Sequence, residues 1–204
     1  IYFGGTDNLL YAVDTRTGQV LPNYPSTPPG PFQGYAMTVD PDVGQAPEGS
    51  EMLYVVSSNM NVYAVNTTLQ RTQSGVVWSY KLPFPPTAAL TLSPDGAVLY
   101  AVTSNPANDT DGMLHALNAT TGHRIWTFYA YVEVHGSWSS YGTLSQPAFV
   151  ATAPGGTHLW TENVPIIAFG PLLVAVDPLR GIAKDIRLHT NGDQFRSAVS
   201  IMDT

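Results

Sequence analysis

A short alternating pattern that ends in Asp or Asn recurs four times along this chain. It reads LYAVD at 10–14, VYAVN at 62–66, LHALN at 114–118 and VAVD at 174–177. The alanines of the first three copies stand 52 residues apart, at 12, 64 and 116, and the alanine of the fourth copy follows 59 residues later. A second apolar run precedes each copy, at 1–4, 53–56, 99–102 and, for the last copy, at 166–169 or 158–160. Repeats of about this length, each made of several short strands, are typical of β-propeller blades.

The repeats predict one all-β domain, 1–204, folded as a β-propeller of about four four-stranded blades. The blades are expected at 1–22 together with 194–204, at 35–82, at 88–128 and at 146–190. The first blade lacks an inner strand, and 194–204 has the pattern of an inner strand with no blade after it. We therefore expect the C-terminal strand, from this chain or from a neighbouring subunit, to complete the first blade, because pairing removes an exposed sheet edge. The chain would then be a closed ring, a piece of a larger propeller, or one link of an assembly.

The composition favours strands and turns over helices. The chain has 18 glycines and 17 prolines, and 11% of its residues are charged, against about a quarter in average domains. Its net charge is −7 and its eight basic residues form no cluster, which argues against a surface for nucleic acid or for an anionic membrane. There is no cysteine, so no disulfide is expected. The longest apolar segment, 164–176, is interrupted by Pro and Gly and is too short to span a bilayer.

The third repeat carries the most complete motif. Residues 116–126, ALNATTGHRIW, fit the pattern Ala-x-Asp/Asn-x-x-Thr-Gly-x-x-x-Trp, in which this chain resembles β-propellers built from the quinoprotein (pyrroloquinoline quinone-like) repeat. The resemblance implies that Trp78 and Trp126 pack between neighbouring blades, against the turn of the adjacent repeat. It also implies a role in blade structure for the turn glycines, which are Gly18, Gly122 and Gly181. Repeats one and four lack the tryptophan and have Pro22 and Asp185 at the same offset from the glycine.

Catalytic residues are not expected in this chain. Quinoprotein dehydrogenases, which the repeat resembles, bind a quinone and Ca²⁺ through an acidic base and an Asn/Glu metal set, and no position here matches those residues. The sequence has no nucleophile elbow and no Gly-rich phosphate loop. Residues 108–112, NDTDG, lack the distal carboxylate of a calcium loop, and the five histidines show no metal-ligand spacing. We therefore expect no enzyme activity, no cofactor and no metal site.

Three sequons, at Asn66, Asn108 and Asn118, lie on predicted turns and make N-glycosylation a hypothesis. Together with the low charge, they favour an extracellular or cell-surface location. The chain opens inside an expected strand, as a processed product or part of a longer chain would.

An insertion rich in aromatic residues and Ser, at 129–145, precedes the fourth repeat and makes Tyr131, Trp138 and Tyr141 candidate interface residues. The expected function is that of a non-catalytic, secreted structural or assembly module that self-associates through its terminal strands into an oligomer or filament. Two alternatives remain open: a fragment of a quinone-dependent dehydrogenase, or an adaptor propeller that binds a peptide or glycan.

Overall fold

The computed structural model describes residues 1–5, 7, 9–22, 24, 38–39, 52–67, 75–107, 111–134, 137–140, 147–149, 164–169 and 172–188. Every regular element in these residues is a β-strand, which confirms the all-β prediction. The strands are β1 (Tyr2–Gly4), β2 (Leu10–Ala12), β3 (Thr38–Val39), β4 (Met52–Val56), β5 (Asn61–Asn66), β6 (Val76–Lys81), β7 (Thr91–Leu92), β8 (Val98–Ser104), β9 (Gly112–Asn118), β10 (Arg124–Tyr129), β11 (Tyr131–Val134), β12 (Ser137–Ser140), β13 (Ile166–Phe169), β14 (Leu172–Val176) and β15 (Ala183–Leu188).

The strands form antiparallel sheets in which each strand pairs with the next one along the chain. Two sheets have four strands, β3-β4-β5-β6 and β7-β8-β9-β10, and a third has the order β13-β14-β15. A bridge from Ala148 to Ile166 adds a segment beside β13, at the beginning of the range expected for the fourth blade, 146–190. In the first blade, β1 pairs with β2, and a bridge between Val13 and Val20 supplies the beginning of an outer strand.

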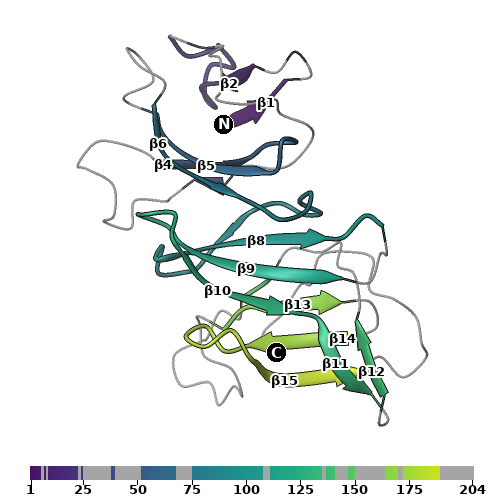
Figure 1. Ribbon diagram of the computed structural model, residues 1–204. Helices are drawn as coiled ribbons and strands as arrows, with labels where there is room; N and C mark the ends of the chain where they lie inside the picture. Colours follow the sequence, from purple (N-terminus) through teal and green to yellow (C-terminus); the bar gives the residue numbers. More distant parts are fainter. Residues whose placement is uncertain are drawn as a thin grey trace.

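The sheets of the four repeats follow one another through the molecule in chain order (Figure 1). The pair β1-β2 lies at one end and the sheet β13-β14-β15 lies towards the other. The segment 194–204, which we expect to complete the first blade, lies outside the described residues, as do Asn108 and Tyr141.

Neighbouring sheets pack face to face, because alternate residues of each strand point to opposite faces. Three apolar clusters fill the spaces between successive sheets. The first joins Leu10 to Leu53, Val55, Tyr63 and Val65; the second joins Tyr54, Val56, Ala64 and Trp78 to Leu99, Ala101 and Leu117; and the third joins Tyr100, Leu114, Trp126 and Phe128 to Ile167, Phe169, Leu172 and Val174. Each cluster contains side chains from two sheets, so the blades are held together by their junctions.

The repeat copies at 62–66, 114–118 and 174–177 and the apolar runs at 53–56, 99–102 and 166–169 agree with β5, β9, β14, β4, β8 and β13 to within about two residues. The exception is the insertion at 129–145, for which no strand is predicted. There β11 and β12 form a hairpin in which Tyr131 is opposite Ser140 and Glu133 is opposite Trp138. The alternation of Tyr, Val, Ser and Trp in this stretch suits a strand, but it falls outside the repeat register from which the blades are predicted.

Candidate functional site

Three turns of the chain share one hydrogen-bond pattern, and all three carry the glycine of the repeat. In each, the Asp or Asn side chain accepts two backbone N–H groups and its carbonyl accepts the N–H of the glycine. Asn118 Oδ1 accepts from Thr120 (3.0 Å) and Thr121 (2.9 Å); Asp14 Oδ1 accepts from Arg16 (2.8 Å) and Thr17 (2.9 Å); and Asp177 Oδ1 accepts from Leu179 (2.9 Å) and Arg180 (3.0 Å). The glycine N–H bonds measure 2.8 Å for Gly122 and 2.9 Å for Gly18 and Gly181.

Charge is not required at the first position of these turns. Backbone N–H groups lower the pKa of the Asp14 carboxyl, with that of Thr17 contributing most, and the Leu179 N–H does the same for the Asp177 carboxyl. Asn118 makes equivalent bonds as a neutral amide. The requirement is therefore a short side chain with an acceptor oxygen.

Trp78 of the second blade is held on the turn of the third blade. Its Nε1–H donates to the carbonyl of Ala119 at 2.9 Å, and the side chain is buried. Its ring lies against Gly122, where an added Cβ would come within 2.5 Å of the indole.

Trp126 of the third blade repeats this arrangement on the turn of the fourth blade. Its Nε1–H donates to the carbonyl of Pro178 at 2.8 Å, and a Cβ added at Gly181 would come within 2.6 Å of its ring. Both glycines have positive φ, 72° at Gly122 and 66° at Gly181. Each turn therefore requires glycine for two reasons: its backbone conformation, and the space beside it that the indole occupies. We call such a turn, with its glycine and carbonyl acceptor, an indole cradle.

A buried tyrosine accompanies each of these tryptophans. Tyr54 and Trp78 have ring centroids 5.9 Å apart, and so do Tyr100 and Trp126. The Tyr54 hydroxyl donates to the Ala119 carbonyl at 3.2 Å, whereas the Tyr100 hydroxyl has no hydrogen-bond partner among the described residues. Burial, followed by the charge of Asp95, raises the pKa of Tyr100, so this hydroxyl keeps its proton.

The two tyrosines should respond differently to loss of the hydroxyl. Tyr54→Phe is expected to cost about 1 kcal/mol, because it removes a buried hydrogen bond. Tyr100→Phe is expected to be neutral or stabilising, since it removes a buried polar atom that lacks a partner. Urea unfolding of the two variants tests this. Equal losses of stability would contradict it.

The junction between the first and second blades uses a different aromatic residue. Pro22 stands where the tryptophan is missing, and Tyr24 packs edge-on against Tyr2 with ring centroids 6.0 Å apart. Tyr2 faces Ala12 across the sheet as Tyr54 faces Ala64, so Tyr24 supplies the aromatic neighbour that Trp78 supplies to Tyr54. The sequence analysis missed Tyr24 because it lies two residues beyond the expected position, at the start of a Pro-rich segment.

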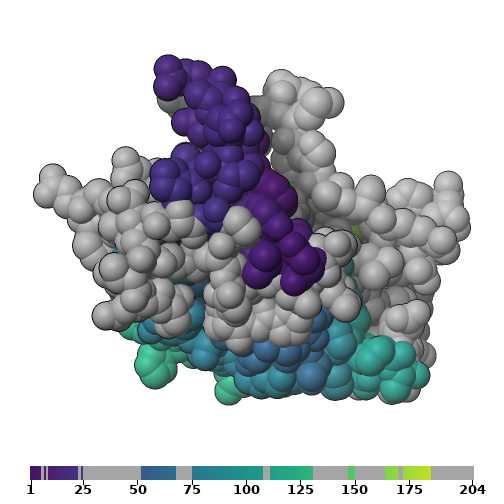
Figure 2. All heavy atoms as spheres, turned by 90° about the horizontal axis from the view of Figure 1, so that it is seen from above, coloured from purple at the N-terminus to yellow at the C-terminus, as the bar shows by residue number. Residues whose placement is uncertain are grey.

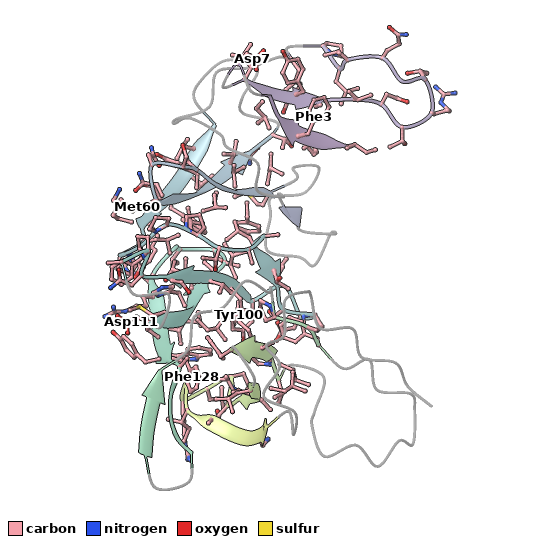
Figure 3. All side chains as sticks on the ribbon, turned by 90° about the vertical axis from the view of Figure 1, so that its right-hand side faces the viewer. Phe3, Asp7, Met60, Tyr100, Asp111 and Phe128 are labelled. Atoms are coloured by element: carbon pink, nitrogen blue, oxygen red, sulfur yellow. The ribbon has the colours of Figure 1, made fainter. Side chains whose placement is uncertain are left out.

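The first strand of the first blade is exposed on one face, at positions where the equivalent strands of the other blades are buried. This first-blade face consists of Ile1, Phe3, Tyr11, Val13 and Val20. Ile1, Phe3 and Val20 are 70%, 44% and 48% exposed, whereas Leu53 and Val55, which correspond to Ile1 and Phe3 in the second blade, are 0% and 1% exposed. Seen from this end, the first blade lies at the surface of the molecule (Figure 2). Figure 3 shows Phe3 on this terminal blade, far from Tyr100 and Phe128 in the interior.

His115 is a buried titratable group at the centre of the third blade. Its Nε2 lies 3.0 Å from Thr103 Oγ1 and its Nδ1 lies 3.1 Å from Thr127 Oγ1, so each ring nitrogen has a hydroxyl partner. Burial, assisted by the charge of Arg124, lowers the pKa of His115 to about 4. The ring is therefore neutral at pH 7.

Stability is expected to fall between pH 6.5 and pH 4 because of His115. The unfolded state binds a proton near pH 6.5 and the folded state binds it only near pH 4, so His115 contributes its full stability above pH 6.5 and loses it as the pH falls. The slope is about 1.4 kcal/mol per pH unit, or roughly 3 kcal/mol over the whole interval. Urea midpoints at pH 7, 6 and 5 measure it. His115→Gln should flatten the slope, and an unchanged slope in that variant would contradict the assignment of the pH dependence to His115.

The remaining predicted site residues do not gather into one site. Asn66 is buried, at 5% exposed, whereas Asn118 is half-buried. Tyr131 and Trp138 lie on the paired strands β11 and β12. Among the described residues there is no cluster of three or more His, Asp or Glu side chains that could hold a metal ion, and no helix long and apolar enough to cross a membrane.

Neither the family models nor the curated proteins matched this sequence. Solved structures match it in fold. A quinohemoprotein alcohol dehydrogenase from Comamonas testosteroni gives a TM-score of 0.59 at 15% identity, over 97% of this chain and 35% of that chain. BBS1N, in complex with ARL6DN, gives 0.56 at 12% identity, over 93% of this chain and 50% of that one. BamB from Moraxella catarrhalis gives a TM-score of 0.50 at 13% identity, over 92% of this chain and 44% of that chain.

The chain thus spans half or less of the length of these solved chains. At such identities the likeness concerns the fold alone. BamB and the quinohemoprotein alcohol dehydrogenase are both β-propellers, and the sheets described above have the strand order of propeller blades. The chain has a β-propeller fold.

Proposed function

We infer that this chain is a non-catalytic assembly module, which associates through the first-blade face with further blades of a propeller. The observation that carries this proposal is the exposure of Ile1 and Phe3 at positions that are buried in the second, third and fourth blades. A contiguous apolar surface of this kind is typical of a protein interface. Its shape is that of a blade face, so a second sheet is the natural partner.

Sedimentation velocity over a range of concentrations tests the proposal. In the absence of such a partner blade, the isolated chain is expected to form species larger than a monomer, because copies then bury their exposed first-blade faces against one another. Phe3→Ser should shift the equilibrium towards the monomer. Ile125→Ser is the matched control, since Ile125 is 45% exposed and Phe3 is 44% exposed, but Ile125 lies on β10 of the third blade. A chain that stays monomeric, or that responds equally to the two substitutions, would overturn the proposal.

The quinoprotein repeat is proposed as the origin of the blades. Support comes from the two indole cradles, which combine the Asn or Asp turn, the glycine and the tryptophan in the arrangement that the resemblance implies. The rival function, that of a piece of a quinone-dependent dehydrogenase, requires quinone and Ca²⁺ to bind. Absorbance titration of the chain with pyrroloquinoline quinone and Ca²⁺ separates the two, because an assembly module gives no saturable change.

The location of the module is also a proposal, namely that it works outside the cell as a glycoprotein. Its support is the sequon at Asn118, which lies half-buried on an exposed turn. Intact-mass analysis of the secreted chain, with and without glycosidase treatment, should find glycan at Asn118 and none at Asn66, because the folded chain buries the Asn66 side chain and cannot accommodate a glycan there. Secreted chain without any glycan would contradict this proposal.

A further inference from the structure

The turn of the first repeat has the geometry of an indole cradle, and no indole of the described residues lies on it. Gly18 has a φ of 71°, against 72° at Gly122 and 66° at Gly181, and Asp14 makes the same bonds as Asn118 and Asp177. A Cβ added at Gly122 or Gly181 would meet a tryptophan ring. A Cβ added at Gly18 would meet no described atom within 4 Å. Residues 15–20 are all exposed.

The empty cradle and the exposed face belong to the same side of the first blade. The second blade packs Leu53, Val55 and Val76 against the first blade. On its corresponding side, which faces the second blade, the third blade carries the cradle that holds Trp78. Ile1, Phe3 and Val20 correspond to Leu53, Val55 and Val76 by their strand pairing. A blade that packs on the first-blade face would therefore bring its outer strand to Gly18.

We propose that the turn from Asp14 to Gly18 is a binding site for an indole, carried on the outer strand of a further propeller blade. The proposal rests on the proposed function, which makes the first-blade face an interface, and it adds the group that the partner brings. The indole ring lies on Gly18. Its Nε1–H donates to the carbonyl of Thr15, which corresponds to the acceptor carbonyls of Ala119 and Pro178.

The partner blade is not the fourth blade of this chain or of a second copy. Trp78 and Trp126 face Ala64 and Ala116 across their sheets, and both already fill cradles. In the fourth blade the residue opposite Ala175 is Asp185. That position offers a carboxylate, which cannot donate to the Thr15 carbonyl and does not pack on an apolar face. The partner therefore carries tryptophan where β15 carries Asp185.

A hairpin that carries its own tryptophan is a suitable probe. A backbone-cyclised, fluorophore-labelled peptide of residues 112–130 presents Trp126 on the second strand of a hairpin, as β9 and β10 do, and cyclisation reduces the entropy lost on binding. Fluorescence anisotropy with the full 204-residue chain is expected to show saturable binding. Trp126→Ala in the peptide should weaken binding more than about tenfold, because a buried indole dominates such contacts.

Substitutions in the protein locate the site. Gly18→Ala should weaken peptide binding to the same extent, since its Cβ takes the place of the ring. Gln19→Ala, at the neighbouring exposed position, should leave binding unchanged. Circular dichroism of each variant checks that the chain is folded. If a protein variant does not fold, the comparison of the Trp126 and Trp126→Ala peptides on the unaltered chain still tests the proposal.

The outcomes separate this inference from the proposed function. The inference would be overturned if the peptides with Trp126 and with Trp126→Ala bound the chain equally well, or if Gly18→Ala left peptide binding unchanged. Either result would overturn it even where Phe3→Ser abolishes the self-association of the chain. Peptide binding that depends on Trp126 and Gly18 supports it. The same binding in a chain that sediments as a monomer supports the cradle and rejects self-association, leaving a different protein or a further part of the polypeptide as the source of the blade.

Discussion

Gly122→Ala is expected to destabilise the protein by roughly 2–5 kcal/mol, while Gly18→Ala is expected to cost only about 1–2 kcal/mol. Both residues have φ near 70° and close the same kind of turn, so both substitutions carry the strain of a left-handed alanine. At Gly122 the new Cβ would in addition lie 2.5 Å from the Trp78 ring, and a buried ring in a packed junction has little room to move. Urea unfolding of the two variants measures the difference.

A double-mutant cycle isolates the clash from the strain. In a Trp78→Ala background the space beside Gly122 is empty, so Gly122→Ala should cost no more than Gly18→Ala does in the wild-type chain. Contacting residues commonly show coupling energies of about 0.5–3 kcal/mol in such cycles. Additive effects of Trp78→Ala and Gly122→Ala would contradict the packing described here.

Trp126→Ala is expected to cost about 3–5 kcal/mol, which is the usual range for removal of a large buried aromatic side chain. The ring is 8% exposed, packs beside Tyr100 with centroids 5.9 Å apart, and donates a hydrogen bond to the fourth blade. Its loss leaves a cavity in the cluster that joins the third and fourth blades. The urea midpoint and the thermal midpoint should both fall.

The neighbouring residue provides the control for this prediction. Ile125 lies on the same strand and is 45% exposed, so Ile125→Ala should change stability by less than about 0.5 kcal/mol. The loss of stability in Trp126→Phe should lie between the losses in Trp126→Ala and Ile125→Ala, because phenylalanine keeps most of the apolar surface and lacks the hydrogen bond to Pro178. A loss at Ile125 equal to that at Trp126 would contradict the assignment of the inward-facing residues.

Exposure of the first-blade face and emptiness of the cradle have a common explanation. In a propeller each blade buries one face against the preceding blade and offers its other face to the next. On the side of the preceding blade, the second, third and fourth blades meet this requirement, as the burial of Leu53, Leu99 and Ile167 illustrates. The first blade meets it on one side only, through Leu10 and Tyr2. A further blade that carries an indole would satisfy both features together.

Much of the fold could be read from the sequence, because the repeat fixes both the strand period and the turn chemistry. The 52-residue spacing, the alternation along each strand and the Asp or Asn before the glycine led to the strand positions of the second and third blades. Tyr24 could not be found in this way, since it takes its place beside Tyr2 through a contact in space and not through the repeat. The hairpin β11-β12 was missed for a similar reason, because no second copy of it exists in the chain for comparison.

The sequence by itself determined that this protein is built of β-propeller repeats and which glycines and tryptophans belong to their turns. Only the tertiary structure decided which cradles are filled. Gly18, Gly122 and Gly181 each follow an Asp or Asn by four residues and have nearly the same backbone conformation. What differs is the neighbour, and neighbours are contributed by residues about 40 to 50 positions away, such as Trp78 for Ala119 and Trp126 for Pro178. Local physics sets the form of each turn, and packing between blades sets whether it is occupied.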